Sequence, residues 1–222
     1  KRKIWEYYVS FVKQKFPNIV TTIYQEMLHF HHTKDDYIEA VRHEMSKGNY
    51  NVAISFLIQG ISQEKDKDLV VLHIECSLQQ AEEEKDEKVR ENTLAQASKF
   101  YAKFLKSSKE VRVHVDLIQK IQKFEFAMSL QNDILTNMLR AFRERAEVWD
   151  VLARRHLDGL FYDENNEDQE SEKNPSTETC VRHALTIYDK SFEYVGEPFR
   201  KQMYTLYITK LLELDASSDA MN

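Results

Sequence analysis

The chain has 222 residues, of which 42% are hydrophobic and 31% are charged, so it can bury a core and is not disordered throughout. Its four glycines and three prolines make up about 3% of the residues against an ordinary share of roughly 12%, which excludes most all-β folds because turn formers are scarce. The net charge of −6 is concentrated in residues 163–173, and the nearly neutral remainder lacks the broad basic surface of a nucleic-acid binder.

Amphipathic helices are predicted for most of the chain. Apolar residues recur at i, i+3, i+4 and i+7, and the 157 residues between the first and second prolines provide no strong helix breaker apart from two glycine stops. Capping boxes are expected to start helices where Thr33 precedes Asp36 and where Ser107 precedes Glu110. Glycines are expected to end helices at Gly48, Gly159 and Gly196. The expected helices are residues 2–14, 18–30, 34–47, 50–61, 67–88, 92–106, 110–122, 125–142, 146–159, 177–194 and 198–213.

These helices come in pairs that repeat along the chain. A large apolar residue early in the first helix of each pair recurs at intervals of 32, 34, 42, 36 and 55 residues, at Trp5, Tyr37, Val71, Val113, Trp149 and Tyr204. The longer intervals coincide with a charged insertion near 81–91 and an acidic loop near 159–176, which is expected to be disordered. The predicted fold is all-α, an α-α superhelix (solenoid) of about six helix pairs that spans residues 1–222 as one domain.

The paired helices carry a recognisable motif. The first helices contain an aromatic residue followed three positions later by a second large one, in the pairs Trp5 and Tyr8, Trp149 and Leu152, and Tyr204 and Tyr207. Second helices contain an apolar-aromatic step at Ile23-Tyr24 and Ile187-Tyr188. The pattern resembles the HAT (half-a-TPR) repeat family, although residues 56–60 lack the aromatic at the second position of the step, where Leu57 stands, and the third and fourth repeats lack a tryptophan. Repeat boundaries between 67 and 142 therefore stay open.

The resemblance implies a function in RNA-processing assemblies. The order of motifs from Trp5 to Leu214 is similar to the order of motifs in the HAT-repeat family found in the UTP-B subcomplex of the small-subunit processome. It implies a non-enzymatic nucleolar scaffold without cofactors, with the β-propeller proteins of UTP-B as partners and with indirect RNA association. Two alternatives stay open: a HAT scaffold of messenger-RNA splicing or 3′-end processing, and a TPR-like peptide-binding adaptor.

Catalytic and metal sites are not indicated by the sequence. The histidines His29, His31 and His32 fall at a helix end without the spacing of a zinc motif. Neither Cys76 nor Cys180 lies in a nucleophile motif, and no glycine-rich phosphate loop is present. We expect no metal, no cofactor, no enzymatic activity and no membrane span, and we expect the chain to be an internal piece of a longer protein.

Two sets of candidate residues follow. One set is expected to pack repeat against repeat: Trp5, Tyr8, Tyr24, Tyr37, Trp149, Leu152, Tyr188, Tyr204 and Tyr207. The other set consists of weak candidates for partner binding in the densest basic cluster: Arg140, Arg143, Arg154 and Arg155. The acidic loop is read as a tolerated insertion, with a docking tail for a basic partner as the alternative.

Overall fold

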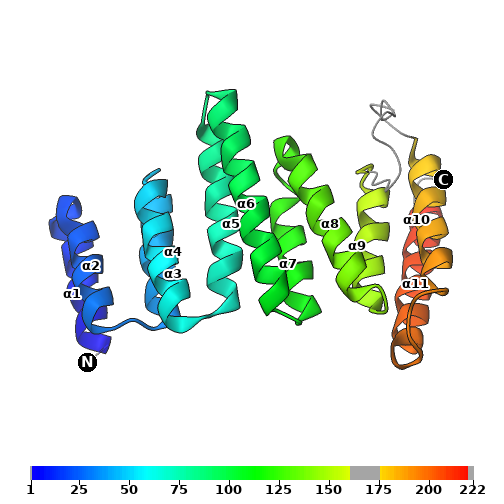
Figure 1. Ribbon diagram of the computed structural model, residues 1–222, viewed down its shortest axis with the longest axis horizontal. Coiled ribbons are helices and arrows are strands. Elements are labelled where there is room, and N and C mark those ends of the chain that lie inside the picture. Colours follow the sequence, from blue (N-terminus) through cyan, green and yellow to red (C-terminus); the bar gives the residue numbers. More distant parts are fainter. Residues whose placement is uncertain (1, 161–175, 220–222) are drawn as a thin grey trace. The chain divides into compact units, whose positions relative to one another are not determined.

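A computed structural model describes residues 2–160 and 176–219 of the chain (Figure 1). Within these residues it contains eleven α-helices, two short 3₁₀ helices and no strand. The helices are α1 (Arg2–Lys15), η1 (Pro17–Ile19), α2 (Val20–Phe30), α3 (Lys34–Met45), α4 (Tyr50–Glu64), α5 (Lys67–Glu83), α6 (Glu87–Ser107), α7 (Val111–Ile121), η2 (Glu125–Ala127), α8 (Met128–Phe142), α9 (Ala146–Leu157), α10 (Thr177–Ser191) and α11 (Glu197–Asp219). No helix in this described part of the chain combines the length and the apolar character that crossing a membrane requires.

Helix starts follow from local capping chemistry. The capping box at Thr33 is confirmed: its hydroxyl and backbone N–H both donate to the Asp36 carboxylate, at 2.6 and 3.2 Å. The box predicted for Ser107 and Glu110 is wrong, because Ser107 ends α6 and Glu110 is itself the N-cap residue of α7. Side-chain oxygens that accept backbone N–H groups also cap α5, α6 and α10, from Asp66, Asp86 and Ser176.

Glycines end two of the helices by adopting a left-handed backbone. Gly48 follows α3 with φ of 73°, and Gly159 follows α9 with φ of 75°, a conformation that costs other residues a steric penalty. The stop predicted at Gly196 works differently. Its N–H donates to the Glu144 carbonyl at 3.2 Å, which ties the turn before α11 to the turn before α9.

The described helices group into two compact units. One comprises residues 1–108 with 123–127, and the other comprises residues 109–122 with 128–222. In the first unit each helix from α1 to α6 contacts the next in chain order. In the second unit α7, α8, α9 and α10 do the same, and α11 packs on α9. That these units act as the single domain expected from the sequence stays a prediction.

Within each unit the odd-numbered helices also contact one another. Such contacts join α3 to α5 in the first unit, and α7 to α9 and α9 to α11 in the second. In each unit taken by itself, the odd-numbered helices, which are the first helices of each pair, therefore form one layer, and their partners form the other. This arrangement confirms the predicted all-α fold and its solenoid type of packing, in which consecutive helix pairs share one core.

The charged stretch at 81–91 lengthens one helix pair. It forms the end of α5, a three-residue turn and the start of α6, so α5 and α6 reach 17 and 21 residues. The acidic loop predicted near 159–176 lies, for residues 161–175, outside the described part of the chain.

The core is built from aromatic and branched side chains between the layers. Tyr24, Tyr37 and Leu57 are fully buried in the first unit, and a glycine on α4 lets Tyr37 approach closely. A Cβ atom added at Gly60 would lie 2.8 Å from the Tyr37 ring and 3.1 Å from a Leu69 methyl group. Gly60 is thus required by packing and not by a turn.

Two of the predicted repeat anchors are off by one residue. On α7 the buried stripe runs through His114, Leu117, Ile118 and Ile121, so His114 takes the place assigned to Val113. On α11 Met203 is fully buried, whereas Tyr204 is 53% exposed and stacks on Phe192 from outside. A shift of one residue turns a side chain by about 100° around the helix, which moves it from the core to the rim.

Trp149 is expected to carry much of the packing of the second unit. Its side chain is buried, its Nε1–H donates to the Arg143 carbonyl at 2.7 Å, and its ring stacks on Tyr194 with centroids 5.5 Å apart. We expect Trp149→Ala to lower the free energy of unfolding by about 3 to 5 kcal/mol, measured by chemical denaturation. Ile58→Ala, on an exposed position of α4, is the control and should change it little; equal losses would contradict the assignment.

Candidate functional site

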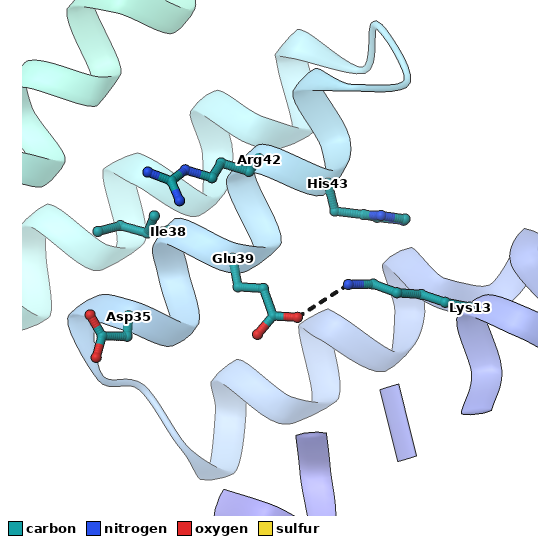
Figure 2. A pocket seen from close by; sticks show the side chains of 6 residues that line it. All are labelled: Lys13, Asp35, Ile38, Glu39, Arg42 and His43. Atoms are coloured by element: carbon teal, nitrogen blue, oxygen red, sulfur yellow. Dashed lines mark hydrogen bonds and ion pairs between the residues drawn. The ribbon is translucent and has the colours of Figure 1, made fainter. Parts of the chain in front are cut away.

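Two surface grooves lie along the odd-numbered helices, one in each unit. The groove of the first unit has a volume of about 390 Å³ and lies between α1 and α3, lined by Lys13, Asp35, Ile38, Glu39, Arg42 and His43 (Figure 2). The groove of the second unit has a volume of about 430 Å³ and runs over α7, α9 and α11, lined by Gln119, Gln122, Val151, Arg154, Leu157, Asp158 and Lys210. Both of these grooves therefore lie on the odd-numbered helices of their units.

A cation, a carboxylate and a buried tyrosine meet at the first groove. Figure 2 shows Glu39 and His43 pointing from α3 toward Lys13 of α1. Lys13 Nζ lies 3.1 Å from Glu39 Oε1, and the hydroxyl of Tyr24, on α2, donates to the same oxygen at 2.9 Å. Burial, followed by this hydrogen bond to Glu39, raises the pKa of Tyr24 well above its ordinary value. The hydroxyl therefore stays protonated and joins the two helix layers.

The remaining charges of the first groove are unequally paired. Asp35 lies 3.6 Å from Arg2. Burial, and then the charge of Lys47, lower the pKa of His43, which favours a neutral imidazole. Arg42 forms no ion pair with any described residue, and it shares the groove with Ile38. The groove thus offers one uncompensated guanidinium beside an apolar side chain.

The second groove repeats the same three-part arrangement. Arg154 Nε lies 2.8 Å from Asp150 Oδ2, and the Tyr188 hydroxyl donates to Asp150 Oδ1 at 2.6 Å. Burial, followed by the hydrogen bond to Asp150, raises the pKa of Tyr188. Lys210 contributes a further cation on α11, 2.8 Å from Glu213. Each unit thus fixes a cation at its groove through a carboxylate that a buried tyrosine holds in place.

This arrangement is suited to binding. Glu39 already accepts hydrogen bonds from Lys13 and Tyr24, and Asp150 from Arg154 and Tyr188, so these two carboxylates are engaged in holding the surface together. Burial raises the pKa of the Cys76 thiol to about 12, which makes it a poor nucleophile. Among the described residues, no group of three or more His, Cys, Asp or Glu side chains is arranged to hold a metal ion.

The residues predicted to pack the repeats fall into three groups by exposure. Five of them are buried: Tyr24, Tyr37, Trp149, Leu152 and Tyr188. Trp5 and Tyr207 are half-buried, and Tyr207 stacks on Tyr188 with ring centroids 5.1 Å apart. Tyr8 and Tyr204 are exposed and are not core residues. Tyr8 is 44% exposed, because Val9 and Val12 take the inward positions of α1.

The arginine cluster does not form one basic patch. Arg154 is paired with Asp150, and the Arg143 guanidinium lies over the Tyr194 ring at 5.4 Å. Arg140 is exposed.

The assignment of Arg155 to partner binding is wrong, because its side chain is 1% exposed. The Arg155 guanidinium donates to the Gln131 side chain at 2.8 Å and contacts Met128 Sδ, and burial lowers its pKa. Gln131 in turn donates to the Ile121 carbonyl at 3.1 Å. Arg155 therefore connects α9 to α8, and through Gln131 to α7.

Comparison with known proteins gives little beyond the helical architecture. No protein-family model matches the chain, and no curated protein matches it. A solved structure to which it is similar is that of a thermophilic TPR protein from Thermus thermophilus, with a TM-score of 0.45 and 14% sequence identity over 92% of this chain and 95% of that one.

The two tyrosine-centred clusters were not predicted as sites. The sequence indicates the Ile-Tyr steps of α2 and α10 as motifs and predicts only a packing role for their tyrosines. The signal in the sequence is weak: an acidic residue follows each repeat anchor, Glu39 two residues after Tyr37 and Asp150 one residue after Trp149.

The tyrosine hydroxyls should contribute measurably to stability. We expect Tyr24→Phe and Tyr188→Phe each to lower the free energy of unfolding by about 1 to 2 kcal/mol, because each removes a hydrogen bond to a charged acceptor. Tyr7→Phe, at an exposed position of α1, is the matched control and should leave stability unchanged. Denaturation curves that coincide for all three variants and the parent would refute a bridging role.

Proposed function

We propose that this chain is a non-catalytic HAT-repeat scaffold in the UTP-B subcomplex of the small-subunit processome, where it holds protein subunits together for pre-ribosomal RNA processing and small-subunit biogenesis. The protein that its order of motifs resembles is the U-three small nucleolar RNA-associated protein 6. The proposed location is the nucleolus.

The observation that carries the scaffold role is that, in each unit taken by itself, a groove lies on the odd-numbered helices. Each groove is lined by residues of odd-numbered helices and of the turns that follow them. A groove between helices can hold an extended segment of a partner, and a chain that has one groove in each of two units can contact its partners at more than one place. This property is useful in a scaffold.

The chemistry of the grooves suits extended protein segments. In the first groove the unpaired Arg42 and the apolar Ile38 suit a segment that carries a carboxylate next to an aliphatic side chain. The β-propeller proteins of UTP-B, whose extensions are flexible, are the partners that the resemblance implies. We assign the grooves to such extensions.

The distribution of arginine supports indirect contact with RNA. Arg145 and Arg154 are paired with acidic residues, Arg143 covers a tyrosine ring, and Arg155 is buried. Phosphate binding gains affinity from the number of available cations, and these four are largely committed to the protein itself. RNA would then reach the scaffold through its protein partners.

Affinity purification of the tagged protein from cells tests the proposal. We expect the propeller subunits of UTP-B to co-purify, together with the U-three small nucleolar RNA and pre-ribosomal RNA. Recovery of splicing or 3′-end processing factors would keep the helix-pair scaffold and overturn the assignment to UTP-B. Recovery of a protein that binds through its C-terminal carboxylate, such as a chaperone, would favour the peptide-binding adaptor.

A matched pair of charge reversals connects this result to the groove. Arg42→Glu places a negative charge in the groove of α3, and Lys99→Glu makes the same change on exposed α6. Only Arg42→Glu should reduce recovery of the partners, with the melting temperature of both variants unchanged. Equal recovery with both variants would remove this groove from the interface.

A further inference from the structure

The groove of the second unit contains one carboxylate that the protein itself does not neutralise. The two cations of this groove each lie 2.8 Å from a carboxylate: Arg154 from Asp150, and Lys210 from Glu213. Asp158 also lines the groove and is exposed, but its side chain forms no hydrogen bond or ion pair with any described residue. The uncompensated charge of this groove is therefore negative, whereas that of the first groove, on Arg42, is positive.

Asp158 lies where helix stability disfavours a negative charge. It is the C-cap residue of α9, and the C-terminal end of a helix carries the negative pole of the helix dipole. Burial lowers the pKa of Arg155, and the charge of Asp158 opposes this shift, but no ion pair joins the two side chains. The carboxylate of Asp158 thus does not stabilise α9, and it is available to a cation that the chain does not supply.

Two glutamines at the end of α7 line the same groove. Gln119 and Gln122 are exposed, and neither carboxamide forms a hydrogen bond with a described residue. Because they are three residues apart, their Cβ atoms lie about 5 to 6 Å from each other on one side of the helix. Along an extended chain, main-chain groups on one side recur about every 6.6 Å. A carboxamide has both donors and an acceptor, so this pair matches the N–H and C=O groups of an extended segment.

The groove crosses three helices that pack side by side. Within the second unit α7 contacts α9, and α9 contacts α11. Packed helices lie about 8 to 10 Å apart, so the path from the glutamines on α7 to Lys210 on α11 is about 16 to 20 Å. An extended segment of about six residues covers this length. Val151, which is buried, and Leu157, which is half-buried, supply the apolar part of the lining.

We propose that the groove over α7, α9 and α11 holds an extended segment of a partner protein that carries a lysine or arginine beside an aliphatic residue. The cation of the segment pairs with Asp158, its aliphatic side chain lies on Leu157, and the two glutamines bond its main chain. This inference rests on the proposed scaffold function and adds a sign to each groove. The first groove takes an acidic segment, and the second takes a basic one.

The charge of the groove argues against two other occupants. Residues 163–173 of this chain contain six acidic residues and one lysine, so their net charge has the same sign as Asp158. A nucleic-acid backbone is also negative. Like charges across a contact cost free energy, whereas a basic segment of a partner meets no such penalty.

Binding of labelled peptides to the 222-residue chain tests the proposal. Three probes of about eight residues consist mostly of valine and threonine, which favour an extended chain, and carry one leucine. They differ only two positions after the leucine, on the same side of the chain, where they have lysine, glutamate or glutamine. Fluorescence anisotropy should show that the lysine and glutamate peptides each bind at least about threefold more tightly than the glutamine peptide.

Charge variants assign each peptide to its groove. Asp158→Asn should weaken the lysine peptide to the level of the glutamine peptide and leave the glutamate peptide unchanged. Arg42→Glu should weaken only the glutamate peptide. Glu193→Gln, which removes an exposed carboxylate from the turn after α10, is the matched control and should change neither. All three positions are exposed, so the melting temperatures should stay the same.

Methylated peptides test the role of the glutamines. Methyl groups on two main-chain nitrogens of the lysine peptide remove N–H donors and should weaken its binding at least about threefold. With Gln119→Ala and Gln122→Ala combined, methylation should have no further effect, because the partners of these donors are already absent. Gln59→Ala with Gln96→Ala, at exposed positions of α4 and α6, is the control and should keep the full effect of methylation.

Four outcomes would overturn the inference. The first is equal weakening of the lysine peptide by Asp158→Asn and Glu193→Gln, or its weakening by Arg42→Glu. The second is an equal effect of methylation in the two glutamine double variants. The third is self-association in sedimentation experiments that Asp158→Lys abolishes, which would assign the groove to a second copy. The fourth is loss of lysine-peptide binding in a longer polypeptide that includes this chain, which would assign the groove to an internal segment.

The peptide experiment and the affinity purification fail independently. Recovery of UTP-B subunits together with equal binding of all three peptides would overturn the charge preference of the grooves and leave the proposed function standing. Opposite preferences of the two grooves together with recovery of splicing factors would support this inference and overturn the assignment to UTP-B.

Discussion

The structure depends on one packing constraint: each odd-numbered helix must bury one face on its own pair and offer an adjacent face to the pair before it. Single helices of 11 to 23 residues gain too little from their own hydrogen bonds to be stable in water, so stability comes from these shared faces. Trp149 and Arg155 on α9 illustrate the two faces. Trp149 packs toward the turn that follows α10, whereas Arg155 reaches back to α8.

The grooves follow from the same layering. Because the odd-numbered helices pack side by side within each unit, their surface residues line the groove of that unit. The buried tyrosines of the even-numbered helices, Tyr24 and Tyr188, contact the groove from the other helix layer of their unit. Tyr24 and Tyr188 each hold a carboxylate that in turn holds a cation at the groove. A buried hydroxyl thus fixes the position of an exposed charge, and a surface organised in this way loses less conformational entropy when a partner binds.

Much of the fold could be predicted from sequence because helix periodicity and scarce turn formers leave few alternatives. The helices occur where the apolar pattern indicates, and Thr33 caps α3 as expected. The errors arise where local chemistry is ambiguous. A serine and a glutamate three residues apart suggest a capping box at Ser107, but Ser107 is the last residue of α6, and the N-cap residue of α7 is Glu110. Apolar character near the expected repeat interval favours Val113 and Tyr204 as anchors, but the residues buried at these places are His114 and Met203.

The candidate site was less predictable, since it depends on which residues of different helices meet. An arginine-rich stretch suggests a basic patch, yet Arg155 is buried and Arg154 is paired, which no linear pattern reveals. The tyrosine bridges need the register between neighbouring helices.

Cross-linking mass spectrometry on the assembly purified from cells tests the central claim most directly. Lys13 and Lys210 line the two grooves, and Lys99 lies on the exposed surface of α6. If the odd-numbered helices form the scaffold surface, Lys13 and Lys210 should cross-link to extensions of the UTP-B propeller subunits more often than Lys99 does. Cross-links to those subunits from Lys99 alone, with none from either groove, would contradict the account.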